Sequence, residues 1–295
     1  MKELLVLSGK GGTGKTSITA SFAVLNQDAM LVDCDVDASD LHLLLSPETR
    51  EKNDFISGVT ARVRPDDCTA CGTCVDICHY DAISTSEDGI AHVEPFTCEG
   101  CAVCAHFCPE NAIDLEPDHC GYWYVSDTDY GPMVHARLIP GEENSGKLVA
   151  LVKKEARERA EKLSKDSILV DGPPGIGCPV IASVSGADMI LVVTEPTQSG
   201  LHDLERVLGL CRHFKIPACV CINKWELNKR LSEEVEKACE RLQVPVVGKI
   251  PFDETVVESL VQGIPVVKYK DCSASKSIAN IWSAIQKMLN QEEQK

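Results

Sequence analysis

The chain has 295 residues, of which 44% are hydrophobic, and its formal net charge is −16 at pH 7. This length is enough for one large hydrophobic core or for one core with a small second module. No run approaches the roughly 18 apolar residues of a membrane-spanning helix. A nucleic-acid-binding protein needs a basic face, which the net charge of −16 disfavours. We therefore expect a cytoplasmic protein with no stable membrane insertion and no nucleic-acid partner.

Outside a central cysteine-rich segment, predicted strands alternate with predicted helices. Residues 3–8 and 29–33 form apolar strands around a helix at 16–25. Beyond the central segment come an extended stretch at 122–139, which contains a Tyr-Gly-Pro turn, and an amphipathic helix at 147–163. Apolar strands then follow at 167–171, 189–194, 218–223 and 246–250, with helices at 180–185, 199–214, 228–242, 253–261 and 275–289. This pattern predicts an α/β fold with a mostly parallel sheet covered by helices on both faces.

A glycine-rich loop lies between the first predicted strand and the first predicted helix. Residues 9–16, GKGGTGKT, match the pattern GxxxxGK[ST]. In such loops the backbone amides surround phosphate groups, the lysine contacts the outer phosphates and the hydroxyl residue binds Mg²⁺. The sequence therefore predicts an ATP or ADP site with Mg²⁺, whose expected contacts are Gly9, Gly11, Gly12, Thr13, Gly14, Lys15, Thr16 and Ser17.

Lys10 adds a second lysine to this loop, and here the sequence resembles the deviant Walker A group of P-loop ATPases, which includes MinD, ParA and Mrp. The resemblance implies a homodimer in the ATP state, in which Lys10 contacts the nucleotide of the other subunit. The alternative is that Lys10 is only a solvated loop lysine.

The same resemblance assigns roles to three further regions. Asp35, in the segment DCDVD after the second strand, corresponds to the aspartate that orients the attacking water, with Asp33 and Asp37 as alternatives. Asp171 resembles the Walker B aspartate, which would hold Mg²⁺ together with Thr16. Asn223 and Pro251 stand where the family contacts the base, although Asn-Lys after a strand is also an ordinary turn.

Eight of the sixteen cysteines form two copies of the spacing CxxCxxCxxxC, thirty residues apart: Cys68, Cys71, Cys74 and Cys78, then Cys98, Cys101, Cys104 and Cys108. This is the bacterial ferredoxin pattern, in which the fourth cysteine of each copy binds the other cluster. The pattern predicts two 4Fe-4S clusters in an α+β ferredoxin module at residues 62–118, inserted into an ATPase domain formed by residues 1–61 and 119–295. Tetrahedral zinc is the competing occupant of four-cysteine sites.

Cys178, seven residues after Asp171, stands near a cluster ligand of the nitrogenase iron protein in the resembled group. It either binds metal or packs at the start of a helix.

Together these motifs indicate an ATP-hydrolysing iron-sulfur protein, slow without its partner, that couples dimer closure to electron transfer with a redox or iron-sulfur partner protein. Two alternatives remain: an iron-sulfur cluster carrier or assembly ATPase of the Mrp type, and a positioning ATPase that senses redox state.

Overall fold

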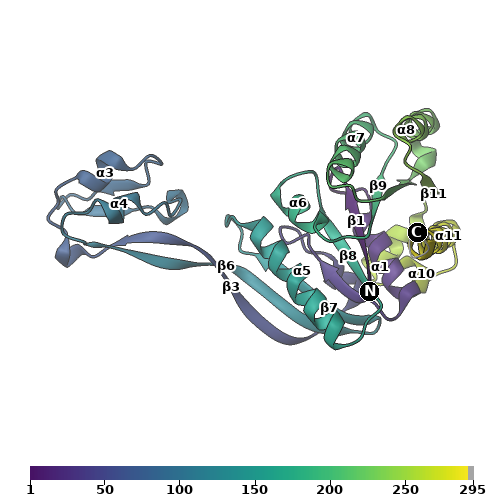
Figure 1. Cartoon of the computed structure of the whole chain (residues 1–295), viewed down its shortest axis with the longest axis horizontal. Helices are drawn as coiled ribbons and strands as arrows, with labels where there is room; N and C mark the ends of the chain where they lie inside the picture. The colour runs from purple at the N-terminus through teal and green to yellow at the C-terminus, as the bar shows by residue number, and fades with distance from the viewer. Residues whose placement is uncertain (292–295) are drawn as a thin grey trace. The chain divides into compact units, whose positions relative to one another are not determined.

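The computed structural model describes residues 1–291 and divides into two compact units (Figure 1). The larger unit contains residues 1–53, residues 122–138 and the chain from Ser145 onward. The cysteine-rich unit contains residues 54–121 and 139–144. The strands β3 (Glu48–Val63) and β6 (Ile113–Thr128) each contribute residues to both units.

Within the described residues, nine strands form one sheet in the order β11-β10-β9-β1-β8-β2-β7-β6-β3. The pairings from β11 to β7 are parallel. Only two residues join β6 to β7, which is a hairpin connection and therefore antiparallel. The prediction of a mostly parallel sheet is confirmed. The remaining strands are β1 (Lys2–Ser8), β2 (Met30–Asp33), β7 (Gly131–Leu138), β8 (Ser167–Pro174), β9 (Met189–Thr194), β10 (Ala218–Asn223) and β11 (Val246–Ile250).

Helices cover both faces of this sheet. Leu4 and Val6 belong to a buried cluster that also contains Phe22 of α1 and Ile281 of α11, whereas the intervening Leu5 is buried on the opposite side of β1. On that opposite side, α5 contacts β2 and β7, and α7 contacts β9. The helices are α1 (Lys15–Asn26), α2 (Leu41–Leu45), α5 (Ser145–Lys162), α6 (Cys178–Val184), α7 (Gln198–His213), α8 (Lys229–Leu242), α9 (Glu254–Val261), α10 (Val266–Tyr269) and α11 (Ser273–Gln291).

The backbone of the cysteine-rich unit repeats itself after thirty residues. A 3-10 turn at Pro65–Asp67 and the helix α3 (Thr73–Ile77) recur as a 3-10 turn at Pro95–Thr97 and the helix α4 (Val103–His106). The strands β4 (Ile83–Thr85) and β5 (Ala91–Val93), which lie between the two repeats in the chain, pair antiparallel with each other. Left-handed backbone angles recur at the same spacing, in the pairs Ala70 and Gly100, Gly72 and Ala102, and Asp81 and Asn111. The repeat of the cysteine spacing is thus also a repeat of backbone conformation.

The sequence did not predict β3 or the short helices α2 and α10. Most of β3 is exposed, so it lacks the apolar run or clean alternation that identifies a strand. The extended stretch expected at 122–139 is two strands, and the first of them, β6, begins nine residues earlier, at Ile113. The bounds of the other predicted strands and helices agree with the structure to within three residues. No helix in residues 1–291 combines the length and the apolar character required to cross a bilayer.

Candidate functional site

The glycine-rich loop joins β1 to α1, at the carboxyl edge of the parallel strands. Gly14 is in the left-handed region (φ 89°), and a Cβ at this position would collide with the side-chain amide of Asn223. Gly9 has no room for a side chain because the backbone and Cβ of Asp203 lie against it. The loop therefore requires glycine at these two positions for backbone geometry and for close packing.

Lys15 is nearly buried and faces two carboxylates. Its Nζ lies 3.0 Å from Oδ1 of Asp171 and 3.6 Å from Oδ2 of Asp35. Burial alone would lower the pKa of Lys15, but the charges of Asp171, Asp35 and Asp33 raise it above its ordinary value. The lysine is consequently a fixed positive charge at the centre of the site.

Asp171 lies in β8 and is fully buried. Its Oδ2 accepts a hydrogen bond from Thr16 Oγ1 at 2.7 Å, and its Oδ1 accepts one from Thr19 Oγ1 at 2.9 Å. The structure thus brings together Thr16 and Asp171, the two residues expected to hold Mg²⁺. The sequence did not single out Thr19, which lies one turn further along α1.

The three aspartates after β2 have different surroundings. Asp33 is buried and accepts hydrogen bonds from Asp35 N, Ser39 Oγ and Leu41 N, so it holds the following loop in place. Burial and the nearby Asp171 charge raise the pKa of Asp33 to about 7. Asp35 is partly exposed and faces Lys15, whereas Asp37 is exposed. Of the three, Asp35 has the position that suits contact with a nucleotide.

Lys10 is held by residues that follow β9. Its Nζ lies 2.6 Å from Glu195 Oε1 and donates hydrogen bonds to Thr197 Oγ1 and Ser199 Oγ, both at 3.2 Å. The sequence analysis did not identify these three residues. These residues lie about 185 positions after Lys10 in the chain, and the parallel pairing of β1 with β9 brings them to the phosphate loop.

The residues expected on the base side of the site also lie at this edge. Asn223 Nδ2 donates a hydrogen bond to the carbonyl oxygen of Thr13 at 2.7 Å. Asn223 pairs with Ile250 in the sheet, so Pro251 follows at the same edge.

The hydroxyl of Thr13, in the phosphate loop, is buried without a hydrogen-bond partner, which is a polar atom left for a ligand. Ser17 lies in the first turn of α1, where its carbonyl oxygen accepts from Ser21 Oγ.

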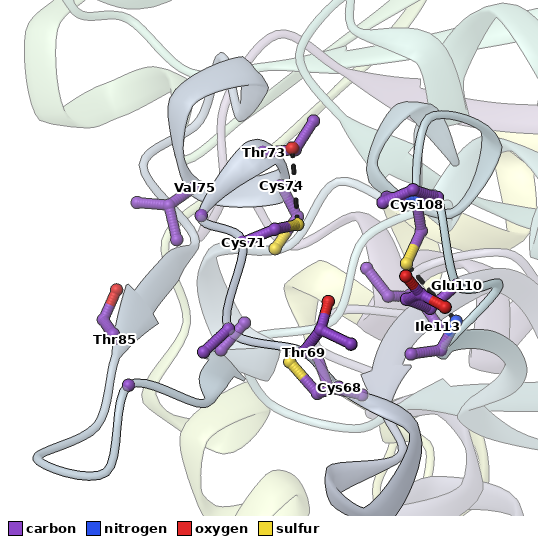
Figure 2. Close-up of a pocket in the computed structure, with 17 residues that line it drawn as sticks. Cys68, Thr69, Cys71, Thr73, Cys74, Val75, Thr85, Cys108, Glu110 and Ile113 are labelled. Atoms are coloured by element: carbon purple, nitrogen blue, oxygen red, sulfur yellow. Dashed lines mark hydrogen bonds between the residues drawn. The ribbon is translucent and has the colours of Figure 1, made fainter.

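The eight clustered cysteines line two cavities of the cysteine-rich unit. Figure 2 shows the first cavity, in which Cys68, Cys71 and Cys74 face Cys108. The second is lined by Cys98, Cys101, Cys104 and Cys78. Each cavity thus combines three cysteines of one copy with the fourth cysteine of the other copy.

The polar surroundings of the cysteines differ between the two cavities. In the first, the backbone N–H of Ala112 donates to Cys108 Sγ at 3.3 Å, and Cys71 Sγ is hydrogen-bonded to Thr73 Oγ1 at 3.4 Å. The hydrogen bond to the Thr73 side chain, and a second to its backbone, lower the pKa of Cys71 and favour its thiolate. Thirty residues after Thr73, the second cavity has Val103, which cannot make the side-chain hydrogen bond.

Across residues 1–291, no three His, Cys, Asp or Glu side chains converge in the way that a single metal ion requires. Zinc needs four ligands around one ion, whereas each thiolate of a 4Fe-4S cluster binds a different iron atom. By residue type, four cysteines around one cavity suit a 4Fe-4S cluster and a zinc ion alike.

The other cysteines do not join either cavity. Cys178 is exposed at the start of α6, beside Gly146. Cys219 and Cys221 are both buried in the sheet core, as expected for alternate residues of one strand face.

Comparisons with known proteins agree with this nucleotide site. Residues 4–266 match the family described as the CobQ/CobB/MinD/ParA nucleotide binding domain. An uncharacterized protein of Methanocaldococcus jannaschii is 34% identical over 231 residues, which cover 77% of this chain and 79% of that protein. The septum site-determining protein MinD of Synechocystis sp. is 26% identical over 276 residues, covering 90% of this chain and 81% of that protein.

Solved structures share the fold at lower identity. MinD of Pyrococcus horikoshii in complex with Mg-ADP is 19% identical, with a TM-score of 0.60, and the match covers 97% of this chain and 96% of that one. MinD of Pyrococcus furiosus is 21% identical, with a TM-score of 0.58, and covers 97% of this chain and 99% of that one. The phosphate loop, the buried aspartate and the family match lead to one conclusion: the chain is a P-loop protein that belongs to the CobQ/CobB/MinD/ParA nucleotide-binding family.

Proposed function

We propose that this protein is a Mg²⁺-dependent ATPase that also binds two 4Fe-4S clusters and couples nucleotide-dependent dimer closure to electron transfer with a redox partner. The observation that carries the proposal is the crossed grouping of the eight cysteines around two cavities, in a chain whose larger unit is a MinD/ParA-type nucleotide-binding domain. A single chain would then contain both a nucleotide site and two redox centres.

In the nucleotide site, the loop amides and Lys15 would bind the phosphates of ATP. Thr16 and Asp171 would hold Mg²⁺, since their oxygens already lie 2.7 Å apart. Asp35 faces Lys15 and would orient the attacking water, while Lys10 would neutralise charge on the nucleotide of the partner subunit. Hydrolysis would be slow until the dimer supplies Lys10.

In the cysteine-rich unit, the first cavity would hold a cluster on Cys68, Cys71, Cys74 and Cys108, and the second on Cys98, Cys101, Cys104 and Cys78. Bound 4Fe-4S clusters supply one-electron transfer at a potential that the protein adjusts. Burial of Cys74 and Cys104 in the apolar core of the unit would exclude water from part of each site. We accordingly assign the cysteine-rich unit, residues 54–121 and 139–144, as a ferredoxin-type module that contains the expected residues 62–118.

The charge of the cysteine-rich unit suggests the nature of the redox partner. Its residues include fifteen Asp and Glu but only Arg62 and Arg64 as fixed basic residues, so the unit accounts for most of the negative charge of the chain. Such a unit attracts a partner with a basic patch, and the association rate should fall as salt is added.

One observation favours the second candidate, a cluster carrier or assembly ATPase. Cys71 and Cys101 are exposed, and they occupy equivalent positions in the two copies. An exposed ligand can be reached by an acceptor thiol, so a cluster could be passed on rather than used for electron transfer.

Anaerobic purification followed by iron and sulfide analysis tests the metal assignment. We expect about eight iron atoms per chain, and roughly half that number after Cys104→Ser. Cys239→Ser is the matched control, because Cys239 is a buried cysteine of α8 that lines neither cavity. Stoichiometric zinc without iron would contradict the proposal.

Electron paramagnetic resonance spectra of the reduced protein with and without Mg-ATP then separate the two candidate functions. A change of the signals with retention of iron supports electron transfer, whereas loss of iron to an added apo-ferredoxin supports the carrier.

A further inference from the structure

Glu195 lies beside the phosphate loop and faces two ammonium groups. Its carboxylate is 2.6 Å from Lys10 Nζ and 3.4 Å from Lys224 Nζ. Partial burial alone would raise the pKa of Glu195, but its hydrogen bonds and ion pairs with these lysines lower it, so the carboxylate is charged at neutral pH. Lys10 comes from the loop after β1, and Lys224 from the loop after β10.

The hydrogen-bonding capacity of Lys10 is fully used within its own subunit. An ammonium group has three N–H donors. Those of Lys10 are directed to Glu195, Thr197 Oγ1 and Ser199 Oγ. Lys10 therefore cannot contact the nucleotide of a second subunit unless it first gives up these contacts.

Lys224 allows Glu195 to release Lys10 without becoming an unpaired charge. Its Nζ also donates to the carbonyl oxygen of Gly12 at 3.3 Å, and its backbone N–H donates to Asn223 Oδ1 at 3.0 Å. These contacts tie Lys224 to the loop independently of Lys10. When Lys10 leaves, Glu195 keeps one cation, which avoids the cost of a half-buried carboxylate without a partner.

We propose that Glu195, together with Thr197 and Ser199, is a positioning site that holds Lys10 inside its own subunit and thereby sets the ATP concentration at which the dimer forms. This inference rests on the proposed role of Lys10 in the partner's nucleotide site. Glu195 would thus oppose dimer closure, although it lies in the loop after β9 and not in the phosphate loop.

The first test measures the contact itself, without a dimer. In the protein without nucleotide, the Lys10 amine should react faster with a limiting acetylating reagent after Glu195→Gln, by roughly two- to five-fold for one partly exposed ion pair. Ser199→Ala should give a smaller increase in the same direction. Peptide mass spectrometry provides the readout, with Lys237, an exposed lysine on α8, as the internal control that should not change.

The second test measures the consequence. Two Lys10 side chains are released per dimer, so Glu195→Gln should raise the dimerisation constant with a non-hydrolysable ATP analogue by roughly four- to twenty-five-fold. Sedimentation velocity over a range of protein concentrations measures this constant. Monomer affinity for ADP should change less than the dimerisation constant, because Lys224 keeps its contacts with Gly12 and Asn223 when Glu195 is replaced.

Two outcomes would overturn the inference. Unchanged Lys10 reactivity in Glu195→Gln would mean that the contact does not restrain Lys10, and raised reactivity with an unchanged or lower dimerisation constant would mean that the restraint does not set closure. Wild-type dimerisation by Lys10→Ala is a different result: it would refute the proposed trans role of Lys10 and this inference with it.

Discussion

The ammonium group of Lys15 lies 3.0 Å from Oδ1 of Asp171, and both side chains are almost completely buried. This ion pair joins the end of the phosphate loop to β8, so each partner compensates the other's loss of hydration. ATP and Mg²⁺ would bring further charges of both signs to the same place. We therefore expect nucleotide binding to replace part of the Lys15–Asp171 contact with contacts to phosphate and Mg²⁺.

Lys15→Ala should abolish nucleotide binding and also destabilise the protein. The substitution removes the phosphate-binding charge and leaves Asp171 as a buried carboxylate without its cation, which costs about 3 kcal/mol in comparable cases. Calorimetric titration with Mg-ADP and thermal unfolding measure the two effects. Lys10→Ala is the matched control: it should keep ADP binding and lose ATP hydrolysis and dimerisation, and wild-type hydrolysis in this variant would refute the deviant Walker assignment.

Gly14→Ala and Gly11→Ala should differ in stability even without nucleotide. At Gly14, the backbone is left-handed and the new Cβ would collide with Asn223 Nδ2. At Gly11, a new Cβ would have no other atom within 4 Å. We expect Gly14→Ala to lower the free energy of unfolding by about 1 kcal/mol or more and Gly11→Ala to leave it nearly unchanged. Equal unfolding midpoints for the two variants would contradict this account of the loop.

Asp33 should make stability depend on pH between about 4 and 7. Its folded-state pKa of about 7 lies above the ordinary value of an aspartate, so the native protein binds the proton more tightly than the unfolded chain does. The tighter binding of this proton stabilises the folded protein at low pH, and this stabilisation is lost as pH rises toward 7. Asp33→Asn should remove that slope.

Denaturant unfolding at a series of pH values measures the slope for both proteins. A pH-independent offset between them is expected, because the substitution also perturbs the hydrogen bonds from Ser39 and Leu41. Parallel pH profiles of wild type and Asp33→Asn would show that Asp33 does not titrate in this range.

The phosphate loop could be predicted from sequence because all its defining residues are adjacent and follow one pattern. The parallel sheet could be predicted because its strands are apolar runs separated by helical segments. By contrast, β3 is largely exposed and has no apolar pattern. The contacts of Lys10 with Glu195 depend on the pairing of β1 with β9, which no local pattern of residues specifies.

Thr73→Val and Val103→Thr should shift the potentials of the two proposed clusters in opposite directions. Hydrogen bonds to cluster sulfur atoms stabilise the reduced, more negative state and raise the potential. Cys71 Sγ donates to Thr73 Oγ1 as a thiol, and as a cluster thiolate it would accept from the same hydroxyl. Val103 is the counterpart of Thr73 in the repeat. Thr73→Val should lower the potential of one cluster, and Val103→Thr should raise that of the other. Redox titrations followed by electron paramagnetic resonance test this, and unchanged potentials in both variants would contradict it.

The affinity for a non-hydrolysable ATP analogue, measured anaerobically in oxidised and in dithionite-reduced protein, tests the central claim most directly. If the clusters and the nucleotide site are coupled, the two affinities should differ by roughly five-fold or more, since couplings between sites are typically about 1 to 3 kcal/mol. The double variant Cys74→Ser and Cys104→Ser, which lacks a ligand in each cavity, should show no effect of dithionite. Identical affinities of the wild type in the two redox states would contradict ATP-gated electron transfer.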